Sequence, residues 1–167
     1  TSTTTTVMGV TANYASVRNE TVAYGRFLSE ADADEYATVA VIGADVVEDL
    51  FGTSVDVLGQ KIRIGSNLYQ VVGILESKGG SFIGSSDNQV IVPITTALAR
   101  IISRSSAHDE VNQISVAVVD AQSIEDAITE VSAILRSRHG IRTGEDEDFN
   151  VMSQESFTEA ATEITGI

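Results

Sequence analysis

Three short apolar runs in the chain predict β-strands. They are TVMGV at 6–10, VAVI at 39–42 and NQVIVP at 88–93. Each run is rich in valine and isoleucine, residues that suit a pleated, half-buried surface. The continuous apolar run at 39–42 predicts a strand that is buried on both faces. The third run ends at the only proline of the chain, Pro93, which is suited to close a strand and open a helix.

The stretch 59–75 predicts a β-hairpin. Ile62 and Ile64 alternate with two basic residues, and the sequence Gly-Ser-Asn at 65–67 then supplies turn chemistry. The return strand is expected at 68–75. One face of this hairpin is therefore predicted to be apolar.

Helical spacing of apolar residues follows two of the strands. The segment 44–51 places apolar side chains on one face, and Gly52 is expected to end this helix in a left-handed conformation. A second helix is predicted after Pro93, and a short one at 13–19. The apolar positions of the two longer helices are Val46, Val47, Leu50 and Phe51, and then Ala97, Leu98, Ile101 and Ile102.

The last third of the chain has the pattern strand, helix, strand, helix. Alternation predicts a strand at 111–120, with Ile114, Val116 and Val118 on one face, and another at 149–153. The helix between them is expected to start at a capping box of Ser123 and Asp126 and to end at Gly140. Its apolar stripe is Ile124, Ala127, Ile128, Val131, Ile134 and Leu135, and a final helix is predicted to carry Phe157, Ala160, Ala161 and Ile164.

Charge excludes some partners. The chain of 167 residues has 10 Lys and Arg against 24 Asp and Glu, which gives a formal net charge of −14. Such a negative electrostatic field repels nucleic acids and anionic lipid headgroups, so no nucleic-acid partner is expected.

The absence of cysteine excludes disulfides and thiol chemistry. No run approaches the roughly 20 apolar residues that span a bilayer, and the first residues lack the features of a signal peptide.

The sequence gives no support for catalysis, a cofactor or a metal. The segment VAVIGADVVEDLFG at 39–52 has the strand-turn-helix pattern of some phosphate sites, but it contains only Gly43 where a dinucleotide fingerprint has three glycines. The acidic stretches 30–35 and 145–148 lack the ligand order of a calcium loop, and the former is also typical of a helix start. His108 and His139 have no second histidine at ligand spacing. We therefore predict no catalytic, cofactor or metal residues.

One loop carries a candidate contact site. Residues 76–88 combine three glycines and four serines, a composition typical of a mobile surface loop. Phe82 and Ile83 lie within this loop, where a core role is hard to explain. They are the candidate residues for contact with a partner or a membrane surface.

The order of these segments resembles the MacB-like periplasmic core domain of ABC transporter permeases. The matching elements are Gly-Arg-Phe at 25–27 followed by acidic residues, the strand ending at Gly43, Leu-Phe-Gly at 50–52, the hairpin at 59–75 and the segment 92–97. Each motif is weak alone, but their order and spacing are specific. The sequence departs from the family at 56–59, where Asp-Val-Leu-Gly replaces the usual Asp-Pro before the hairpin.

The resemblance implies an α+β fold with two subdomains. A porter-like subdomain would be formed by both ends of the chain, residues 1–30 and 109–167. A mainly β, sabre-like subdomain with helices, residues 31–108, would be inserted between them. Both ends of the chain would then lead into transmembrane helices.

The resemblance also implies a function without catalysis. The domain would lie on the extracytoplasmic side of the membrane and relay conformational changes driven by ATP hydrolysis in a separate ATP-binding subunit or domain. It would contact substrate or adaptor proteins, be monomeric in isolation and belong to a dimeric permease. Two alternatives stay open at this point: a small hydrolase that uses a carboxylate pair, and a free-standing ligand-binding module.

Overall fold

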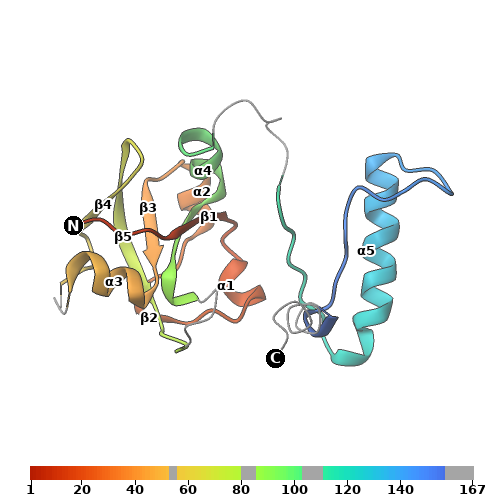
Figure 1. Cartoon of the computed structure of the whole chain (residues 1–167), viewed down its shortest axis with the longest axis horizontal. Helices are drawn as coiled ribbons and strands as arrows, with labels where there is room; N and C mark the ends of the chain where they lie inside the picture. Colours follow the sequence, from red (N-terminus) through yellow and green to blue (C-terminus); the bar gives the residue numbers. More distant parts are fainter. Residues whose placement is uncertain (53–55, 80–85, 103–110, 157–167) are drawn as a thin grey trace. The chain divides into compact units, whose positions relative to one another are not determined.

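A computed structural model of the chain describes residues 1–52, 56–79, 86–102 and 111–156. The chain divides into two compact units, Thr1–Ser115 and Val116–Ile167. The elements of both are labelled in Figure 1.

A six-stranded mixed sheet forms the centre of the first unit. Its strands are β1 (Thr6–Val10), β2 (Val22–Gly25), β3 (Val39–Ile42), β4 (Lys61–Ile64), β5 (Asn67–Leu75) and β6 (Gln89–Pro93). The order in the sheet is β1-β6-β3-β5-β2, and β4 also pairs with β5. The pairs β1–β6 and β3–β5 are parallel, and the other three pairs are antiparallel. The strands expected at 6–10, 39–42, 59–75 and 88–93 are confirmed.

The hairpin of β4 and β5 is confirmed, but its turn is one residue shorter than the sequence predicts, because Asn67 already belongs to β5. Ile64 pairs with Asn67, and Gly65 between them has a φ of 59°. Glycine adopts this left-handed conformation without the steric penalty that a side chain would cause. Ile62 is buried whereas Lys61 and Arg63 are exposed, so the alternation along β4 separates a core face from a solvent face.

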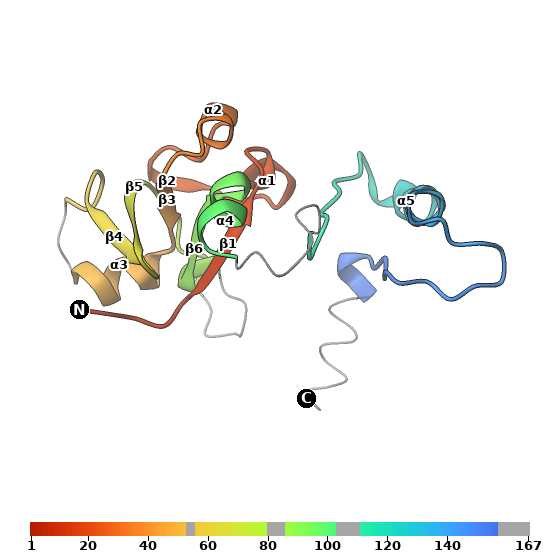
Figure 2. The same cartoon turned by 90° about the horizontal axis from the view of Figure 1, so that it is seen from above.

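Helices cover both faces of this sheet (Figure 2). The helices α3 (Ala44–Phe51) and α4 (Ile94–Arg100) contribute Val46 and Ala97 to the larger core cluster, around the fully buried Tyr69. The opposite face holds a second cluster, against which Tyr14 of α1 (Tyr14–Val17) packs. Both clusters are apolar and fully excluded from water at their centres, which is the main source of stability in a fold of this kind.

The helix boundaries follow from the residues at their ends. Pro93 is the N-cap of α4, as expected. Gly52 ends α3 with φ 66° and ψ −142°. The positive φ confirms the need for glycine, but this ψ lies outside the left-handed helical region that the sequence suggests.

The second unit is built around α5 (Ile124–His139), a helix of 16 residues that follows a short 3-10 turn η2 (Ala121–Ser123). The helix ends at Gly140, as predicted, and Gly140 has the left-handed conformation. The expected capping box is wrong, because the Ser123 side chain does not cap α5. Ser123 instead donates to Asp120 Oδ1 from both its backbone nitrogen and its hydroxyl, each at 2.9 Å.

The two strands predicted in the last third are also wrong. Residues 111–120 and 149–153 have no ladder partner in the part of the chain that the structure describes, and Ile114 and Val116 are 65% and 58% exposed. Alternating apolar and polar residues indicate that a segment could form a strand with one apolar face. A strand also needs a neighbouring strand that pairs with its backbone N–H and C=O groups, and the sequence pattern does not indicate one. Residues 154–156 are helical, and the rest of the predicted final helix lies outside the described residues.

The mixed α/β fold class is confirmed. The structure adds that β1 and β2 belong to the same sheet as β3 to β6. The division into subdomains 1–30 with 109–167 and 31–108 stays a prediction.

Candidate partner-contact site

The acidic stretch at 30–35 forms the short helix α2 (Glu30–Asp34). Ser29 is its N-cap and forms a capping box with Asp32, in which the Asp32 backbone nitrogen donates to Ser29 Oγ at 3.3 Å and the Ser29 backbone nitrogen donates to Asp32 Oδ2 at 2.8 Å. The helix-start interpretation of this stretch is therefore confirmed. No group of three or more histidines, aspartates and glutamates that could hold a metal ion occurs among residues the structure describes.

Arg26 binds Asp32 through two hydrogen bonds. The guanidinium donates to the two carboxylate oxygens at 2.6 and 3.0 Å, and the Asp32 side chain is only 9% exposed. The hydrogen bond from Arg26, together with those from Ser29, lowers the pKa of Asp32 well below its usual range, although burial opposes this shift. The same hydrogen bond raises the pKa of Arg26. The pair locks the start of α2 to the end of β2 and uses the charge of Asp32 for structure.

Two glycines let the backbone approach closely beside this pair. Gly25, with a φ of 79°, is the register partner of Gly73 on β5. A Cβ atom at Gly73 would overlap the carbonyl oxygen of Arg26. The Gly-Arg-Phe motif and the Val-Val-Gly motif at 71–73 therefore contact each other, and both act in packing.

The turn after β3 is also structural. The Gly43 nitrogen donates to the carbonyl oxygen of Gln89 at 2.9 Å, which extends the pairing of the sheet into the turn. Asp45 lies in the first turn of α3, where a bound phosphate would meet its negative charge. The arrangement gives no support to a phosphate site.

The base of the loop 76–88 is held by one buried carboxylate. Asp87 is 3% exposed and lies in the 3-10 turn η1 (Ser86–Asn88). It accepts hydrogen bonds of 3.0 Å each from the Ser77 hydroxyl, the Lys78 nitrogen and the Gly79 nitrogen. Asp87 thus ties residues 77–79 to residues 86–88, across the intervening positions of the loop.

A second set of contacts joins the base of the loop to residues 19 and 20, which lie between α1 and β2. Lys78 Nζ lies 2.9 Å from Glu20 Oε2 and donates to the carbonyl oxygen of Asn19 at 3.2 Å. The Glu20 side chain is 5% exposed, so the pair is partly shielded from water. The candidate contact residues Phe82 and Ile83 lie outside the described residues.

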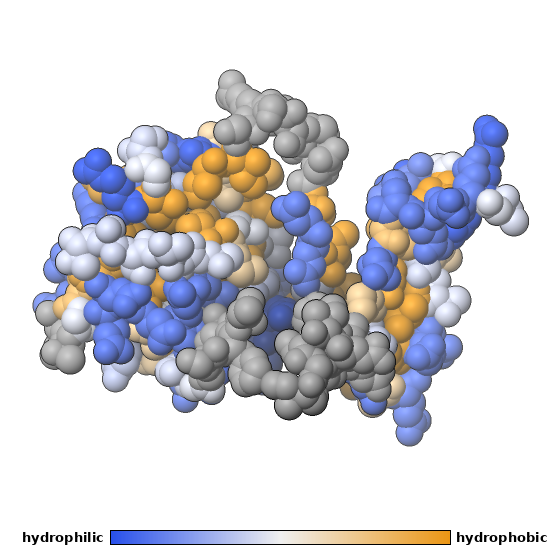
Figure 3. Space-filling view, viewed as in Figure 1, coloured by the Kyte–Doolittle hydropathy of each residue, from blue (hydrophilic) through white to orange (hydrophobic). Residues whose placement is uncertain are grey.

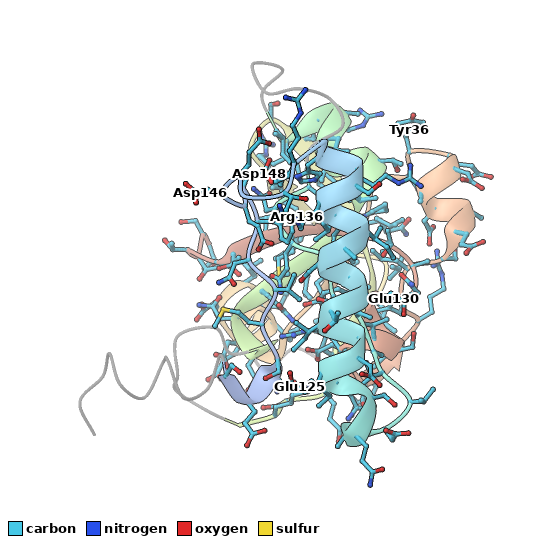
Figure 4. The ribbon with its side chains drawn as sticks, turned by 90° about the vertical axis from the view of Figure 1, so that its right-hand side faces the viewer. Tyr36, Glu125, Glu130, Arg136, Asp146 and Asp148 are labelled. Atoms are coloured by element: carbon cyan, nitrogen blue, oxygen red, sulfur yellow. The ribbon has the colours of Figure 1, made fainter. Side chains whose placement is uncertain are left out.

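In the second unit, the acidic stretch 145–148 is used in ion pairs. Arg136 donates to Glu147 at 2.9 Å, and His139 Nδ1 lies 2.7 Å from Asp148 Oδ1. Arg136 and Asp148 are labelled in Figure 4. The hydrogen bond with His139 lowers the pKa of Asp148. His139 also contacts Phe149 edge to face, with 5.8 Å between ring centroids. This histidine therefore has a structural role at the end of α5, whereas His108 lies outside the described residues.

Sequence reasoning identified neither the pair of Arg26 and Asp32 nor the hydrogen bonds that Asp87 accepts. The spacing Ser29-x-x-Asp32 is that of a capping box, which indicates the contact between Ser29 and Asp32 but not the one between Arg26 and Asp32. No local pattern identifies Asp87, whose donors lie 8 to 10 residues away in the sequence. None of the described helices is long and apolar enough to cross a membrane.

The chain is similar to known proteins in family, sequence and fold. The family model of the MacB-like periplasmic core domain matches residues 1–134. A macrolide export ATP-binding/permease protein MacB of Azoarcus sp. (strain BH72) is 35% identical over 164 residues, which is 96% of this chain and 24% of that protein. A second MacB, from Bdellovibrio bacteriovorus, is 31% identical over 157 residues, 93% of this chain and 23% of the relative. The chain thus spans about a quarter of the length of these relatives.

Two solved structures share the fold. One is the periplasmic region of MacB from Actinobacillus actinomycetemcomitans, with a TM-score of 0.64 and 20% identity over 93% of this chain and 64% of that one. The other is the extracellular domain of the ABC-type transporter YknZ from Gram-positive bacteria, with a TM-score of 0.68 and 22% identity. It is matched over 88% of this chain and 69% of its own.

Proposed function

Because this chain belongs to the family of MacB-like periplasmic core domains, we propose that it relays conformational changes across the membrane as the extracytoplasmic part of an ABC transporter permease. The observation that carries the proposal is the family match over residues 1–134, together with a fold shared with two extracytoplasmic transporter domains. The remainder of the full-length protein would supply the transmembrane helices, and an ATP-binding domain or subunit would supply the energy.

The domain itself acts without catalysis in this proposal. Several charged side chains form ion pairs within the domain, such as Arg26 with Asp32 and Arg136 with Glu147. These ion pairs stabilise the fold in this proposal and take no part in catalysis. The turn at Gly43 is part of the sheet. A titration of the purified domain with Mg-ATP by calorimetry should show no saturable binding, and binding in the micromolar range would contradict this part of the proposal.

The loop 76–88 is the proposed contact with an extracytoplasmic adaptor, a substrate protein or the neighbouring permease subunit. Support comes from its base, where Asp87 joins the two ends of the loop and Lys78 pairs with Glu20 outside it. An anchored base limits the conformational entropy that partner binding would have to remove. Phe82 and Ile83 supply the apolar side chains for the contact.

Two variants of the full-length transporter test this contact. Phe82→Ser with Ile83→Ser should impair transport and leave the thermal midpoint of the isolated domain nearly unchanged. Leu68→Ser is a matched control, because Leu68 is 49% exposed on β5 and belongs to the same unit. Equal loss of transport in both variants, or a midpoint lowered by many degrees in the double variant, would contradict a specific contact at the loop.

Oligomeric state and domain organisation complete the proposal. The isolated domain is monomeric, because a net charge of −14 opposes self-association, and the full permease is dimeric. Both chain ends contribute to a porter-like subdomain, with residues 31–108 as the inserted one. Sedimentation of the isolated domain in moderate salt tests the first statement, and a stable dimer at low micromolar concentration would contradict it.

A further inference from the structure

The basic residues of this chain are too few to neutralise its carboxylates. The chain has 24 Asp and Glu residues against 8 Arg and only 2 Lys. Even if each Lys and Arg paired with one carboxylate, 14 carboxylates would have no cation from the chain itself. Like charges repel one another more strongly in the compact fold than in the expanded unfolded chain. The net charge therefore opposes folding unless ions from the solution reduce the repulsion.

The helix α3 shows how this repulsion acts locally. It contains no basic residue, and its three acidic residues, Asp45, Glu48 and Asp49, are all exposed. Hydrophilic residues are visible over α3 in the space-filling view (Figure 3). Asp45 lies three and four residues before the other two, which is the spacing at which like charges on a helix destabilise each other. Glu48 and Asp49 also lie in the last turn, where the helix dipole disfavours anions.

The end of α2 has the same arrangement. Asp34 is the last residue of this helix and Glu35 is its C-cap, and both side chains are exposed. The helix contains no basic residue, and of its carboxylates Asp32 is the one that Arg26 binds. In α5, by contrast, acidic residues occupy the first turn and basic residues the last turn, as the helix dipole favours. Unfavourably placed anions are thus a feature of α2 and α3 in the first unit.

Monovalent salt can compensate charges that are spread out in this way. No group of three or more His, Asp and Glu that could hold a metal ion occurs in the part of the chain that the structure describes. Dissolved salt needs no such site, because it shortens the range of electrostatic interactions from about 10 Å at 0.1 M to about 3 Å at 1 M. Exposed carboxylates are screened strongly, whereas the buried carboxylate of Asp32 is screened less in its pair with Arg26. Salt therefore weakens the repulsion more than it weakens this ion pair.

We propose that the fold of this domain is stabilised by a salt-rich medium on the extracytoplasmic side of the membrane, whose cations supply the charge compensation that the chain lacks. The family to which the chain belongs places the domain on that side, so its surface contacts the ions of that medium and not those of the cytoplasm. The domain is most stable at high salt and is destabilised by dilution. This inference is independent of the proposed relay of conformational changes and of the proposed contact at the loop 76–88.

Thermal unfolding of residues 1–167 in 0.1 M and in 2 M sodium chloride tests the proposal on three proteins. The first is the wild type. The second, a neutral variant, replaces four exposed carboxylates by amides: Asp34→Asn, Glu35→Gln, Glu48→Gln and Glu76→Gln. The third is a matched control that keeps the charge at the same positions: Asp34→Glu, Glu35→Asp, Glu48→Asp and Glu76→Asp.

The wild type and the control should have thermal midpoints more than about 5 °C higher in 2 M than in 0.1 M sodium chloride. The neutral variant should have the highest midpoint of the three at 0.1 M and a rise about half as large. The reason is that electrostatic repulsion grows with the square of the net charge, which falls from −14 to about −10. Salt can also strengthen apolar burial, but that effect would act on the three proteins equally.

Three results would overturn the proposal. A wild-type midpoint that is equal or lower in 2 M sodium chloride would show that charge repulsion does not limit stability. A rise in the neutral variant as large as that of the wild type would assign the effect to apolar burial. A rise that requires calcium or magnesium and is absent in sodium chloride would indicate a discrete metal site. If thermal unfolding is irreversible, the urea concentration at half-unfolding in each salt solution gives the same comparison.

Discussion

The two units of the chain differ in how far they complete their own core. In the first unit, Val41, Ile42 and Ile91 are entirely buried between helices and neighbouring strands. In the second, the longest helix of the described chain has no buried residue. Both units contain apolar residues at helical or strand spacing, so the difference lies in the segments that each set of apolar residues packs against.

This difference separates local from non-local determinants of structure. The α5 helix has favourable ends, with acidic residues in its first turn, basic residues in its last turn and Gly140 after it. These features define where the helix begins and ends, but they contribute only modestly to its stability. In the first unit the strand pairs β1–β6 and β3–β5 bring residues from distant parts of the sequence together, and burial follows from that pairing.

The largest expected effect comes from truncating one isoleucine in each unit. Ile91→Ala should lower the free energy of unfolding by about 2 to 5 kcal/mol, because Ile91 is 0% exposed and its loss leaves a cavity. Ile134→Ala in α5 should change it by less than about 0.5 kcal/mol, because Ile134 is 51% exposed. Urea unfolding of both variants of residues 1–167 measures the difference, and equal effects would remove the distinction between the units.

A smaller effect is expected from adding a methyl group to a glycine. Gly73→Ala should cost about 1 to 3 kcal/mol, because its Cβ would overlap the Arg26 carbonyl oxygen and move β2 away from β5. Gly65→Ala is the matched control, since a Cβ there meets no atom within 4 Å and only the positive φ opposes it. Thermal unfolding of both variants measures the contrast. A Gly73→Ala protein as stable as the wild type would show that the two motifs do not pack as described.

The pair of Arg26 and Asp32 gives a pH-dependent effect. Asp32→Asn should cost about 1 to 2 kcal/mol near neutral pH, because an amide replaces a carboxylate that binds a guanidinium. The half-exposed Arg26 is screened by water and keeps this value modest. Asp34→Asn, at an exposed position of the same helix, is the control.

The sign of this pH dependence follows from the lowered pKa of Asp32 in the folded protein. The carboxylate stabilises the fold fully above its unfolded pKa of about 4, and the contribution is lost as the pH falls below that value toward the folded pKa. The midpoints of wild type and Asp32→Asn should therefore converge on acidification below about pH 4. A gap that is constant from pH 7 to pH 3 would contradict an ionic contribution.

The smallest effect is expected at the end of α5. The Asp148 side chain is 64% exposed, and the hydrogen bond with His139 that lowers its pKa is accessible to water. Asp148→Asn should leave the thermal midpoint of residues 1–167 without a resolvable change at any pH between 5 and 8. A clear decrease would indicate that the acidic stretch 145–148 stabilises α5 more than its exposure suggests.

Much of the first unit could be predicted from the sequence because its signals are local. The apolar run at 39–42, the turn at Gly65 and the proline at position 93 each identify an element within a few residues. The strand β2 was not predicted, because its four residues are mostly exposed and lack alternation. The segments 111–120 and 149–153 show the opposite failure, since alternation is present but no partner strand is described.

The candidate site was less predictable than the fold. Asp87 accepts hydrogen bonds from the backbone nitrogens of Lys78 and Gly79, and no sequence pattern around Asp87 indicates these contacts. Composition identifies only the loop 76–88, whose two ends Asp87 joins. Arg26 and Asp32 belong to a recognisable motif, but their interaction depends on the capping geometry of Ser29. Side-chain pairing of this kind is fixed by backbone geometry, which the order of residues reveals only in part.

Hydrogen exchange of residues 1–167 tests the contrast between the units most directly. Amides of β3, β5 and β6 should exchange only through global unfolding, because both faces of their sheet are covered. Amides of α5 should exchange faster by several orders of magnitude, through local opening of a helix with no buried residue. Protection of α5 equal to that of β3 would contradict the account, because it would show that the second unit is as complete as the first.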